Sequence, residues 1–301
     1  MKDMKKKIEG EKIGFIGQGW IGKNYADDFE ERGYRVVRYD VEKFANNKDL
    51  IADCSIVFIA VPIPTTKKGF DYSIVESVLP LIGKGKTTVI KSTVLPGTTE
   101  KLQKKFPKIH IFHSPEFLME ATAAHNARHP DRNIIGIPTL NAKNKKLAEE
   151  VLKVLPKSDY NKVMHVREAE MVKYIGNGFL YTKVVFFNIM FDMLKAQKLD
   201  YENVREAVAM DPRITGAHTK ILHNSGHTRH IGRGAGGHCF IKDFEAMLGM
   251  HKQFLGEDLG LKALKGYREK NNSLLVNSKK DLELLSGVIG KSNMQKYAKK
   301  K

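Results

Sequence analysis

The sequence predicts an α/β protein in which a doubly wound parallel sheet is followed by an all-helical domain with a long central helix. Short β-branched runs alternate with helical stretches in the first half of the chain, which is the pattern of a parallel sheet covered by helices on both faces. A glycine-rich turn lies between the first run and the first helical stretch. From about residue 163 the apolar residues recur at helical spacing instead, so the second half is expected to be helical.

Six runs are expected to be the strands of the first domain, which we place at residues 1–162. They are apolar on both faces, which favours buried parallel strands over the edges of an open antiparallel sheet. The runs cover residues 12–17, 34–40, 54–62, 87–93, 109–115 and 133–138.

We place a second, helical domain at residues 163–260. Apolar residues from Met171 to Leu194 recur at helical spacing without a proline, which predicts one long helix. Its apolar stripe is wide enough for a dimer surface, although an intrachain core explains it nearly as well. Residues 211–238 are rich in Gly, His and Arg and predict a loop before a further helix. Residues 261–301 are polar and Lys-rich, and predict short helices with a frayed end.

The composition excludes several classes of protein. With 301 residues the chain can form two domains, and no apolar run approaches the roughly 18 residues of a membrane-spanning helix. The N-terminus has a basic cluster without the apolar region of a secretory signal. Two cysteines make no disulfide framework and suit a reducing compartment. We therefore expect a cytoplasmic protein.

The net charge of +17, from 51 Lys and Arg against 34 Asp and Glu, favours anionic partners such as nucleotides. Most of the excess is Lys, spread over expected helical faces and the tail at 296–301. The interleaved aromatic residues of a single-strand binding surface are not part of this pattern. Nucleic-acid binding is therefore not favoured.

The segment GQGWIG lies directly after the first expected strand and opens a helical stretch. Glycines here permit a tight turn and let backbone amides approach a pyrophosphate at the positive end of the helix; they are Gly17, Gly19 and Gly22. The next expected strand ends at Asp40, whose carboxylate would accept hydrogen bonds from ribose hydroxyls and repel a 2′-phosphate. This Rossmann arrangement favours NAD. Arg38 and Lys43 leave NADP open. The alternative for Asp40, a solvated residue at a strand end, is less favoured because the glycine fingerprint lies upstream.

Several further motifs follow in a fixed order. Together with the dinucleotide loop, they resemble the UDP-glucose and GDP-mannose 6-dehydrogenase family along most of residues 12–250. A glycine fingerprint followed by SPEFL, K-x-x-x-N and GG-x-C-x-x-KD in this order is highly specific, although any one motif is not. The motifs are AVPIP (60–64), KSTVLPGTT (91–99), SPEFLME (114–120), HPDRNIIG (129–136), EMVKYIGNGFL (170–180), MDPRI (210–214) and GRGAGGHCFIKD (232–243).

The resemblance implies that Cys239 is the catalytic nucleophile of an NAD-dependent nucleotide-sugar dehydrogenase. Oxidation of an alcohol to an acid takes two hydride transfers, and the aldehyde between them must be held and made a hydride donor again. A thiolate does both, because its adduct with the aldehyde is oxidised to a thioester that water cleaves. A helix start and the nearby Lys242 would stabilise the thiolate. The alternative of an inert thiol better fits Cys54, in an expected core strand.

Further catalytic roles are implied by the resemblance. Lys173 and Asn177 lie one helical turn apart and share a face, on which they stabilise the alkoxide. Asp243 works with the Lys through a bound water to hold the proton of the C6 hydroxyl. Glu120 assists thioester hydrolysis, and Thr93 orients the catalytic water. For Asp243, Glu120 and Thr93, helix capping or charge pairing at a helix N-terminus is the alternative.

The resemblance also implies which residues contact the ligands. The expected NAD contacts are Gly17, Gly19, Trp20, Ile21, Gly22, Asp40, Lys43, Val61, Pro62, Thr93 and Glu120. The expected substrate contacts are Glu116, Phe117, Leu118, Glu120, Lys173, Asn177, Arg213 and Gly236. Arg213 would reach across a homodimer to the substrate of the partner.

Two departures from the family bear on the substrate, for which UDP-glucose is the expectation. Family members normally continue into a third domain that holds the nucleotide, whereas only a short polar stretch follows Leu261 here. Ala235, His238 and Ile241 replace the Phe, Ser and Pro expected around the nucleophile, and His238 could tune its proton affinity. Three explanations compete: another chain supplies the nucleotide half, the substrate is smaller, or the activity has been lost.

Two other functions stay open. A 3-hydroxyacid-type dehydrogenase shares the dinucleotide loop and a K-x-x-x-N helix but needs no thiol and transfers one hydride. A non-catalytic scaffold that binds NAD or nucleic acid would explain the absent domain and the basic charge. Histidines cluster between His218 and His238, but their spacing has no coherent ligand pattern, so no metal site is expected.

Overall fold

A computed structural model of the protein describes residues 11–66, 69–118 and 122–298. The chain divides into two compact units, Met1–Lys173 and Tyr174–Lys301. The division falls later than the expected boundary at residue 162, and residues 261–301 belong to the second unit instead of standing apart. The later boundary arises because the first turns of the long helix belong with the sheet unit.

Within the described residues, the first unit holds a seven-stranded sheet in the order β2-β1-β3-β6-β7-β8-β9. Neighbouring strands run parallel except at the β7–β8 pair. The strands are β1 (Lys12–Ile16), β2 (Arg35–Tyr39), β3 (Ile56–Ile59), β6 (Thr87–Ile90), β7 (His110–His113), β8 (Arg132–Ile137) and β9 (Tyr160–His165). The predicted doubly wound sheet is confirmed, and β1 and β3 flank the point where the strand order reverses.

Two details of the sheet differ from the prediction. β8, expected to be parallel, pairs antiparallel with β7 through His113 and Gly136. A seventh strand, β9, occupies residues expected to lie in a loop and at the start of the long helix. Its sequence YNKVMH is exposed over its first three residues and only half-buried beyond them. An edge strand of this kind lacks the continuous apolar run that marks a buried strand.

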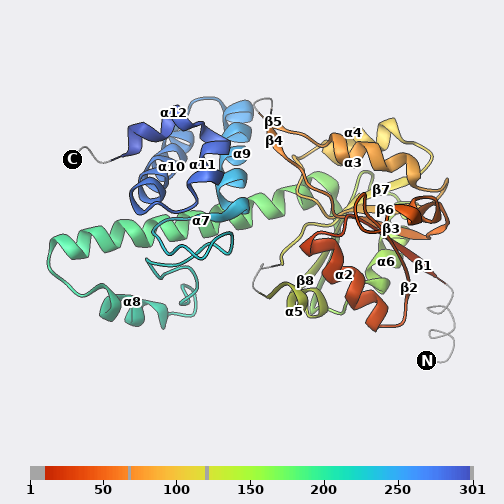
Figure 1. Cartoon of the computed structure of the whole chain (residues 1–301), viewed down its shortest axis with the longest axis horizontal. Coiled ribbons are helices and arrows are strands. Elements are labelled where there is room, and N and C mark those ends of the chain that lie inside the picture. The colour runs from red at the N-terminus through yellow and green to blue at the C-terminus, as the bar shows by residue number, and fades with distance from the viewer. Residues whose placement is uncertain (1–10, 67–68, 119–121, 299–301) are drawn as a thin grey trace. The chain divides into compact units, whose positions relative to one another are not determined.

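Helices cover both faces of the sheet (Figure 1). On one face, aromatic rings of β1, α2 and β3 pack together, with Phe15 lying 5.2 Å from both Phe29 and Phe58 between ring centroids. Ile16, Ile59 and the other aliphatic residues of the opposite face form a second core. The first face carries α2 (Trp20–Glu31), α5 (Ala123–Arg128) and α6 (Ala142–Val154), and the second carries η1 (Ala45–Asp53), α3 (Ser73–Val78), η2 (Leu79–Leu81) and α4 (Thr98–Lys105). A two-stranded ribbon, β4 (Thr65–Thr66) and β5 (Gly69–Phe70), stands outside the sheet.

The second unit is helical, as predicted. Its long helix α7 (Val166–Ala196) has 31 residues and begins in the first unit. The rings of Tyr181 on α7 and Phe244 on α9 stack at 3.8 Å between centroids and centre the core. The other helices are α8 (Tyr201–Ala209), α9 (Gly237–Leu255), α10 (Leu259–Ser278), α11 (Leu282–Ile289), α12 (Lys291–Met294) and η4 (Gln295–Tyr297). None of the described helices is long and apolar enough to cross a bilayer.

The region predicted as short helices with a frayed end is more ordered than expected. α10 has 20 residues, and Leu261, Leu274 and Leu275 are buried. Leu275 and Leu285 pack with Ile241 of α9 in a separate cluster. Many of the polar residues of this region lie on the exposed sides of the helices, although Asn271, Asn272, Lys280 and Asp281 are buried. Composition alone does not distinguish these two groups, which is why it suggested a tail.

Candidate active site

The carboxyl ends of β1, β3, β6 and β7 lie at one edge of the sheet, where ligands of open α/β sheets bind. Backbone hydrogen bonds continue the sheet for one residue beyond β3, β6 and β7. The amides of Ala60, Lys91 and Ser114 donate to the carbonyls of Ile16, Ile59 and Ile90. Motif segments expected to contact NAD or substrate therefore begin side by side, although they are far apart in the sequence.

The dinucleotide loop has the shape that a pyrophosphate needs. Gly17 has a φ of +90°, and a Cβ on it would lie 2.4 Å from the carbonyl oxygen of Ala60. A Cβ on Gly22 would lie 2.0 Å from the carbonyl oxygen of Gly17. A Cβ on Gly19 would meet no described atom within 4 Å, and no side chain caps α2 at this residue. The start of α2 therefore has free space at Gly19 and no capping side chain, which fits a pyrophosphate bound at the positive end of the helix.

Asp40 follows β2 and is held as a carboxylate. The amide of Gln18 donates to its Oδ2 at 2.9 Å, and the amide of Glu42 donates to its Oδ1 at 3.0 Å. Burial alone would raise the pKa of Asp40, but these amides and the charge of Lys43 hold it below its usual value. Each oxygen keeps a lone pair for a ribose hydroxyl, so the geometry suits the role predicted for Asp40.

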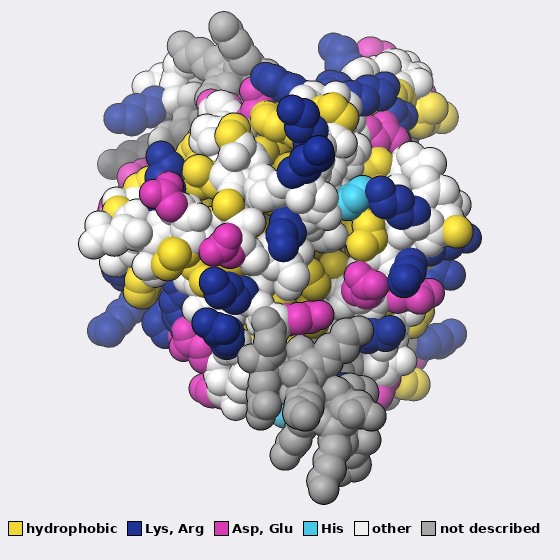
Figure 2. Space-filling model, turned by 90° about the vertical axis from the view of Figure 1, so that its right-hand side faces the viewer, with side chains coloured by type: hydrophobic (Ala, Val, Ile, Leu, Met, Phe, Trp, Pro, Cys, Tyr) yellow, Lys and Arg dark blue, Asp and Glu magenta, His cyan; other side chains and the backbone are white. Residues whose placement is uncertain are grey.

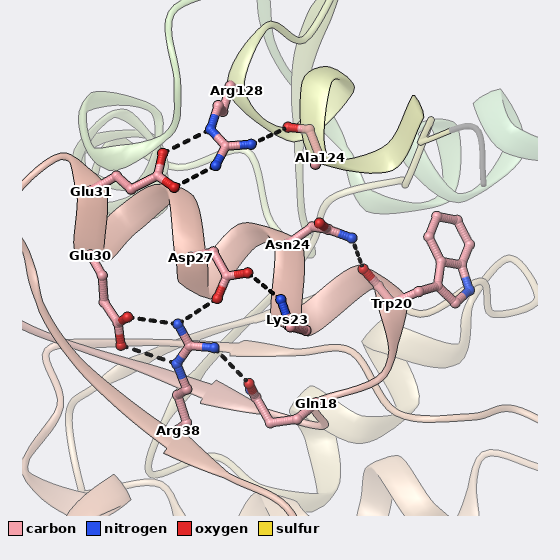
Figure 3. A network of polar contacts seen from close by, with 10 residues as sticks. All are labelled: Gln18, Trp20, Lys23, Asn24, Asp27, Glu30, Glu31, Arg38, Ala124 and Arg128. Atoms are coloured by element: carbon pink, nitrogen blue, oxygen red, sulfur yellow. Dashed lines mark hydrogen bonds and ion pairs between the residues drawn. The ribbon is translucent and has the colours of Figure 1, made fainter. Parts of the chain in front are cut away.

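Arg38 is bound within the first unit (Figure 3). Its guanidinium donates to Glu30 at 3.0 and 2.7 Å, to Asp27 at 2.7 Å and to the side chain of Gln18 at 3.4 Å. The acidic residues of α2 thereby bind Arg38. This is the arginine whose position near Asp40 made NADP a possible cofactor. This arrangement favours NAD, because a 2′-phosphate would have to compete with two carboxylates for Arg38.

The loops after β3 and β6 are joined beside the dinucleotide loop. The hydroxyl of Ser92 donates to the carbonyl of Val61 at 2.6 Å, which places the half-buried Thr93 next to the AVPIP segment. The side chain of Ile21 packs against the core under α2, so its expected contact with NAD would be made by its backbone amide. The side chains of Trp20, Lys43 and Pro62 are exposed.

A buried ion pair lies under the expected substrate segment. Lys91 and Glu116 are 5% and 4% exposed, and Lys91 Nζ lies 3.5 Å from Glu116 Oε2. Lys91 also donates to Ser114 Oγ at 3.2 Å and lies over the ring of Tyr25 at 4.4 Å. Burial lowers the pKa of Lys91, and the charge of Lys173 adds to the effect while Glu116 opposes it. Lys173 is therefore close enough to this cluster for its charge to affect the pKa of Lys91.

Glu116 shapes the backbone that the sequence assigned to the sugar. Its Oε1 accepts the amides of Phe117 and Leu118, both at 2.7 Å, and the hydroxyl of Tyr25 at 3.5 Å. These residues line a pocket together with Arg132, whose guanidinium lies 3.9 Å from the centroid of the Phe117 ring. Glu120, to which both NAD contact and thioester hydrolysis were assigned, lies outside the described residues.

Glu170 ties the start of α7 to the loop that carries Thr93. It is 1% exposed and accepts the amides of Gly97 and Thr99 at 2.6 and 3.0 Å and the hydroxyl of Thr99 at 2.7 Å. The carboxylate thereby caps α4, whose own N-cap residue has no side chain. Lys173 follows Glu170 by three residues on α7, so this anchor sets the position of Lys173. Sequence inspection missed this role, although the motif containing Glu170 was recognised.

In the second unit, α7 and α9 bring two predicted catalytic residues together. Asn177 Nδ2 donates to Asp243 Oδ2 at 2.7 Å, and Asp243 is 1% exposed. The helices approach closely because Gly178 has no side chain: a Cβ there would lie 2.8 Å from the sulfur of Met247. Lys242 Nζ lies 3.7 Å from Asp243 Oδ1. The sequence predicted neighbouring roles for Asn177 and Asp243 but not this direct hydrogen bond.

The two cysteines differ as expected. Cys239 is exposed in the first turn of α9, two residues after its first residue, Gly237. Cys54 is 0% exposed, and burial raises the pKa of its thiol to about 11. A thiol with so high a pKa is a poor nucleophile at neutral pH. Of the two thiols, that of Cys239 is the exposed one.

Other expected site residues of the second unit have local partners. Arg213 is exposed and forms a forked ion pair with Asp211, with bonds of 3.0 and 2.6 Å. Gly236 precedes α9 and lies against the carboxylate of Asp281. His238 Nε2 lies 3.0 Å from His227 Nδ1. In the part of the chain that the structure describes, no three His, Cys, Asp or Glu residues form a group able to hold a metal.

The fold and the glycine loop define a dinucleotide-binding protein. Residues 43–155 match the NAD binding domain of the UDP-glucose/GDP-mannose dehydrogenase family, and residues 167–273 match the central domain of the same family. The chain belongs to this family, and NAD is the cofactor of its first domain.

Known relatives extend this assignment. A UDP-glucose 6-dehydrogenase of Pseudomonas aeruginosa is 32% identical over 244 residues, which cover 76% of this chain and 51% of that protein. The structure of a UDP-glucose dehydrogenase from Pyrobaculum islandicum superposes with a TM-score of 0.70 at 26% identity, covering 89% of this chain and 71% of that one. A UDP-D-ManNAc dehydrogenase from Pyrococcus horikoshii shares the fold, with a TM-score of 0.71 at 21% identity, covering 88% and 69% of the two chains. The matches cover 29–51% of the length of the first three curated relatives.

Proposed function

We propose that the protein oxidises the C6 alcohol of a nucleotide sugar to a carboxylate, with UDP-glucose as the substrate and UDP-glucuronate as the product. The observation that carries the proposal is the exposed Cys239 at the start of α9, one helical turn before the buried Asp243 that Asn177 holds. A nucleophile and a proton-handling pair thus share one short helical segment. When bound, NAD accepts the hydride in each of the two oxidations.

Cys239 makes the second oxidation possible. Its thiolate adds to the aldehyde carbon, and the resulting thiohemiacetal carries the hydrogen that leaves as the second hydride. The thioester that remains is cleaved by water, which returns the thiol and releases the acid. Overall, one alcohol, two NAD⁺ and one water yield one carboxylic acid, two NADH and two protons.

The amine and amide on α7 stabilise the oxyanions of this sequence. We assign Lys173 and Asn177 to the alkoxide of the substrate, since they lie four residues apart on one helix and share a face. Asp243 accepts the Asn177 amide and so fixes its orientation, and it is our candidate for holding the proton from the C6 hydroxyl. Glu120 and Thr93 stay assigned to thioester hydrolysis.

The test of the proposal is the ratio of NADH to acid. The full chain is incubated with NAD and, separately, with UDP-glucose, UDP-ManNAc and GDP-mannose, while NADH absorbance and acid product are followed together. Two NADH per acid with UDP-glucose is the expected result. One NADH per turnover without acid would favour the 3-hydroxyacid-type reaction instead. NAD binding without turnover on any of these sugars would favour the scaffold, and salt-sensitive DNA binding would strengthen that outcome.

We further propose that the protein is a homodimer formed through α7, in the reducing cytoplasm that keeps Cys239 a thiol. Five large apolar side chains of α7 are exposed at spacings of three, four or seven residues, which puts them on one stripe of the helix. They are Ile175, Phe179, Phe186, Ile189 and Met193. A second copy of the chain can cover such a stripe with its own, because a two-fold interface pairs a surface with itself.

Replacing Phe179, which is 65% exposed, by Glu is expected to convert the dimer to monomer, because a carboxylate would be buried against apolar side chains. Light scattering on the eluting protein measures the mass. Phe254→Glu is the matched control, since Phe254 is 73% exposed at the far end of α9 and is not part of the stripe. A wild-type protein of single-chain mass would end the dimer proposal.

On the surface shown in Figure 2, Lys and Arg side chains are interspersed with Asp and Glu and apolar residues. A single basic patch does not dominate the described part of this face. The high net charge of +17 therefore gives no support here to a continuous binding track for nucleic acid.

A further inference from the structure

The glycine-rich loop at residues 232–237, directly before Cys239, is held by side chains from the end of α10 and the turn after it. The backbone of Ala235 is bound twice by one amide group: its N–H donates to Asn271 Oδ1 at 2.7 Å, and its carbonyl accepts from Asn271 Nδ2 at 2.9 Å. The N–H of Arg233 donates to Ser278 Oγ at 3.0 Å. Four side chains take part, and we call them the clamp: Asn271, Ser278, Lys280 and Asp281.

The two charged residues of the clamp bind the loop on either side of Ala235. Lys280 Nζ donates to the carbonyl of Gly234 at 2.8 Å. Asp281 Oδ2 accepts the N–H of Gly237 at 2.8 Å, and its Oδ1 accepts the hydroxyl of Ser225 at 2.9 Å. Lys280 and Asp281 are 0% and 5% exposed, so these bonds are little weakened by water.

The glycines of the loop are required by the closeness of the clamp. A Cβ on Gly236 would lie 2.0 Å from Asp281 Oδ2, and one on Gly234 would lie 2.9 Å from Asn271 Oδ1. Gly232 would meet Lys280 Cβ at 2.8 Å. Over these residues the backbone of the loop therefore lies directly against the clamp.

Most of the clamp lies outside the stretch that matches the family. The central-domain match ends at residue 273, whereas Ser278, Lys280 and Asp281 follow it. Asp281 has a φ of +50° and ends the turn between α10 and α11. A segment beyond the family match thus carries the side chains that order the loop before the nucleophile.

Asp281 also places a negative charge at the start of α9. Gly237, whose amide it accepts, is the first residue of the helix, and Cys239 follows two residues later, about 3 Å along the axis. The positive end of a helix stabilises a thiolate in its first turn. A carboxylate bound to the first amide opposes that effect.

We propose that Ser278, Lys280 and Asp281 are positioning residues for Cys239, which order the loop leading to it, and that Asp281 restrains the reactivity of the thiol. The proposal rests on the proposed function in one respect, that Cys239 is the nucleophile. The side chains act through the backbone of residues 233–237 and not on the substrate.

Other titratable groups also lie near the start of α9. Burial lowers the pKa of Lys280 to about 8, against the opposing effect of Asp281, so Lys280 is largely charged at pH 7. Burial and the charge of Lys280 lower the pKa of His223 to about 4, so His223 is neutral there. The further titratable groups on or beside the first turns of α9 are His227, His238, Lys242 and Asp243.

Alkylation of Cys239 by iodoacetamide tests the proposal without NAD or a sugar. The rate is measured from pH 5.5 to 9.5 in a Cys54→Ala background, which leaves Cys239 as the one thiol. Asp281→Asn keeps the shape of the side chain and removes its charge, and Asn tolerates a positive φ. We expect the rate profile to shift to lower pH and the rate at pH 7 to rise about two- to five-fold, the factor that corresponds to a helix-end charge interaction.

Asp258→Asn is the matched control, because Asp258 caps α10 in the same way, by accepting the amide of Leu261 at 2.7 Å, beyond the opposite end of α9. It should leave the profile unchanged. An Asp281→Asn profile that matches the wild type, or that shifts to higher pH, overturns the restraint. A merely structural role of Asp281 would change the melting temperature without moving the profile.

Ser278→Ala tests the ordering of the loop separately, whether or not the Asp281 variant folds. Loss of its bond to Arg233 is expected to raise amide hydrogen exchange at residues 233–237 about tenfold, while the last turns of α9 keep their protection. Unchanged exchange in the loop would overturn the positioning role. Neither measurement depends on turnover, so a failure of the proposed dehydrogenase activity would be seen independently.

Discussion

Replacing Cys239 by Ser is expected to abolish formation of the sugar acid, with a loss on the order of 10³-fold or more in the overall rate. A serine hydroxyl is scarcely ionised at neutral pH and would form an oxygen ester instead of a thioester. The aldehyde would then neither be held nor be made a hydride donor efficiently. The measurement is acid produced from UDP-glucose and NAD, quantified by chromatography beside NADH absorbance.

The affinity for NAD should be unchanged in this variant, because the residues that fit the cofactor belong to the first unit, around Gly17 and Asp40. Cys54→Ala is the control substitution: it removes the other thiol, which is buried in the core of the first unit. It should cost some stability and leave turnover intact. Undiminished acid formation by Cys239→Ser would refute the thioester route, whatever the substrate.

The main features of the fold were predictable where the apolar pattern is continuous. Buried strands such as β3, whose four residues are all buried, can be recognised in the sequence as apolar runs. β9 was missed because an edge strand needs only one covered face, and its first three residues are exposed. The antiparallel pairing of β8 with β7 was missed for another reason: strand direction depends on the path of the connecting chain, which residue type does not record.

The sequence motifs predicted individual residues of the candidate site, but they did not predict which of these residues contact one another. Asn177 and Asp243 were each assigned from a motif, yet their hydrogen bond joins residues 66 positions apart. Lys91 and Glu170 lie inside recognised motifs and were given no role. A Lys directly after a buried strand and a Glu one turn before Lys173 were signals for both, because a charge placed among buried residues must find a partner.

The clamp was beyond the reach of sequence inspection. Its hydrogen bonds with the loop span 36 to 46 positions, and its members occur in a stretch whose composition suggested a polar tail. The glycines of residues 232–237 were the visible half of the interaction. Closely spaced glycines can indicate either an approaching ligand or an approaching part of the same chain, and only the structure distinguishes the two.

The glycines of the dinucleotide loop can likewise be required either by the packing of the chain or by an approaching ligand. Substitutions of Gly22 and Gly19 are expected to distinguish these two reasons. Gly22→Ala should lower the free energy of unfolding by about 3 kcal/mol, the upper range for forcing a methyl group into a packed site. Its Cβ would lie 2.0 Å from the carbonyl oxygen of Gly17, so the loop and the start of α2 must move apart. With the amides displaced, NAD affinity should fall on the order of 100-fold.

Gly19→Ala should leave stability within about 1 kcal/mol of the wild type, since Ala is only modestly worse than Gly at an N-cap. Gly19 has a φ of −67°, which any residue adopts, and its Cβ would meet no described atom within 4 Å. NAD affinity should nevertheless fall about tenfold or more, because the methyl group would occupy the space through which a pyrophosphate approaches the helix amides. Chemical unfolding and NAD titration by calorimetry separate the two effects. Equal NAD affinity in Gly19→Ala and the wild type would mean that the pyrophosphate does not lie over this residue, since a methyl group in its path cannot be neutral.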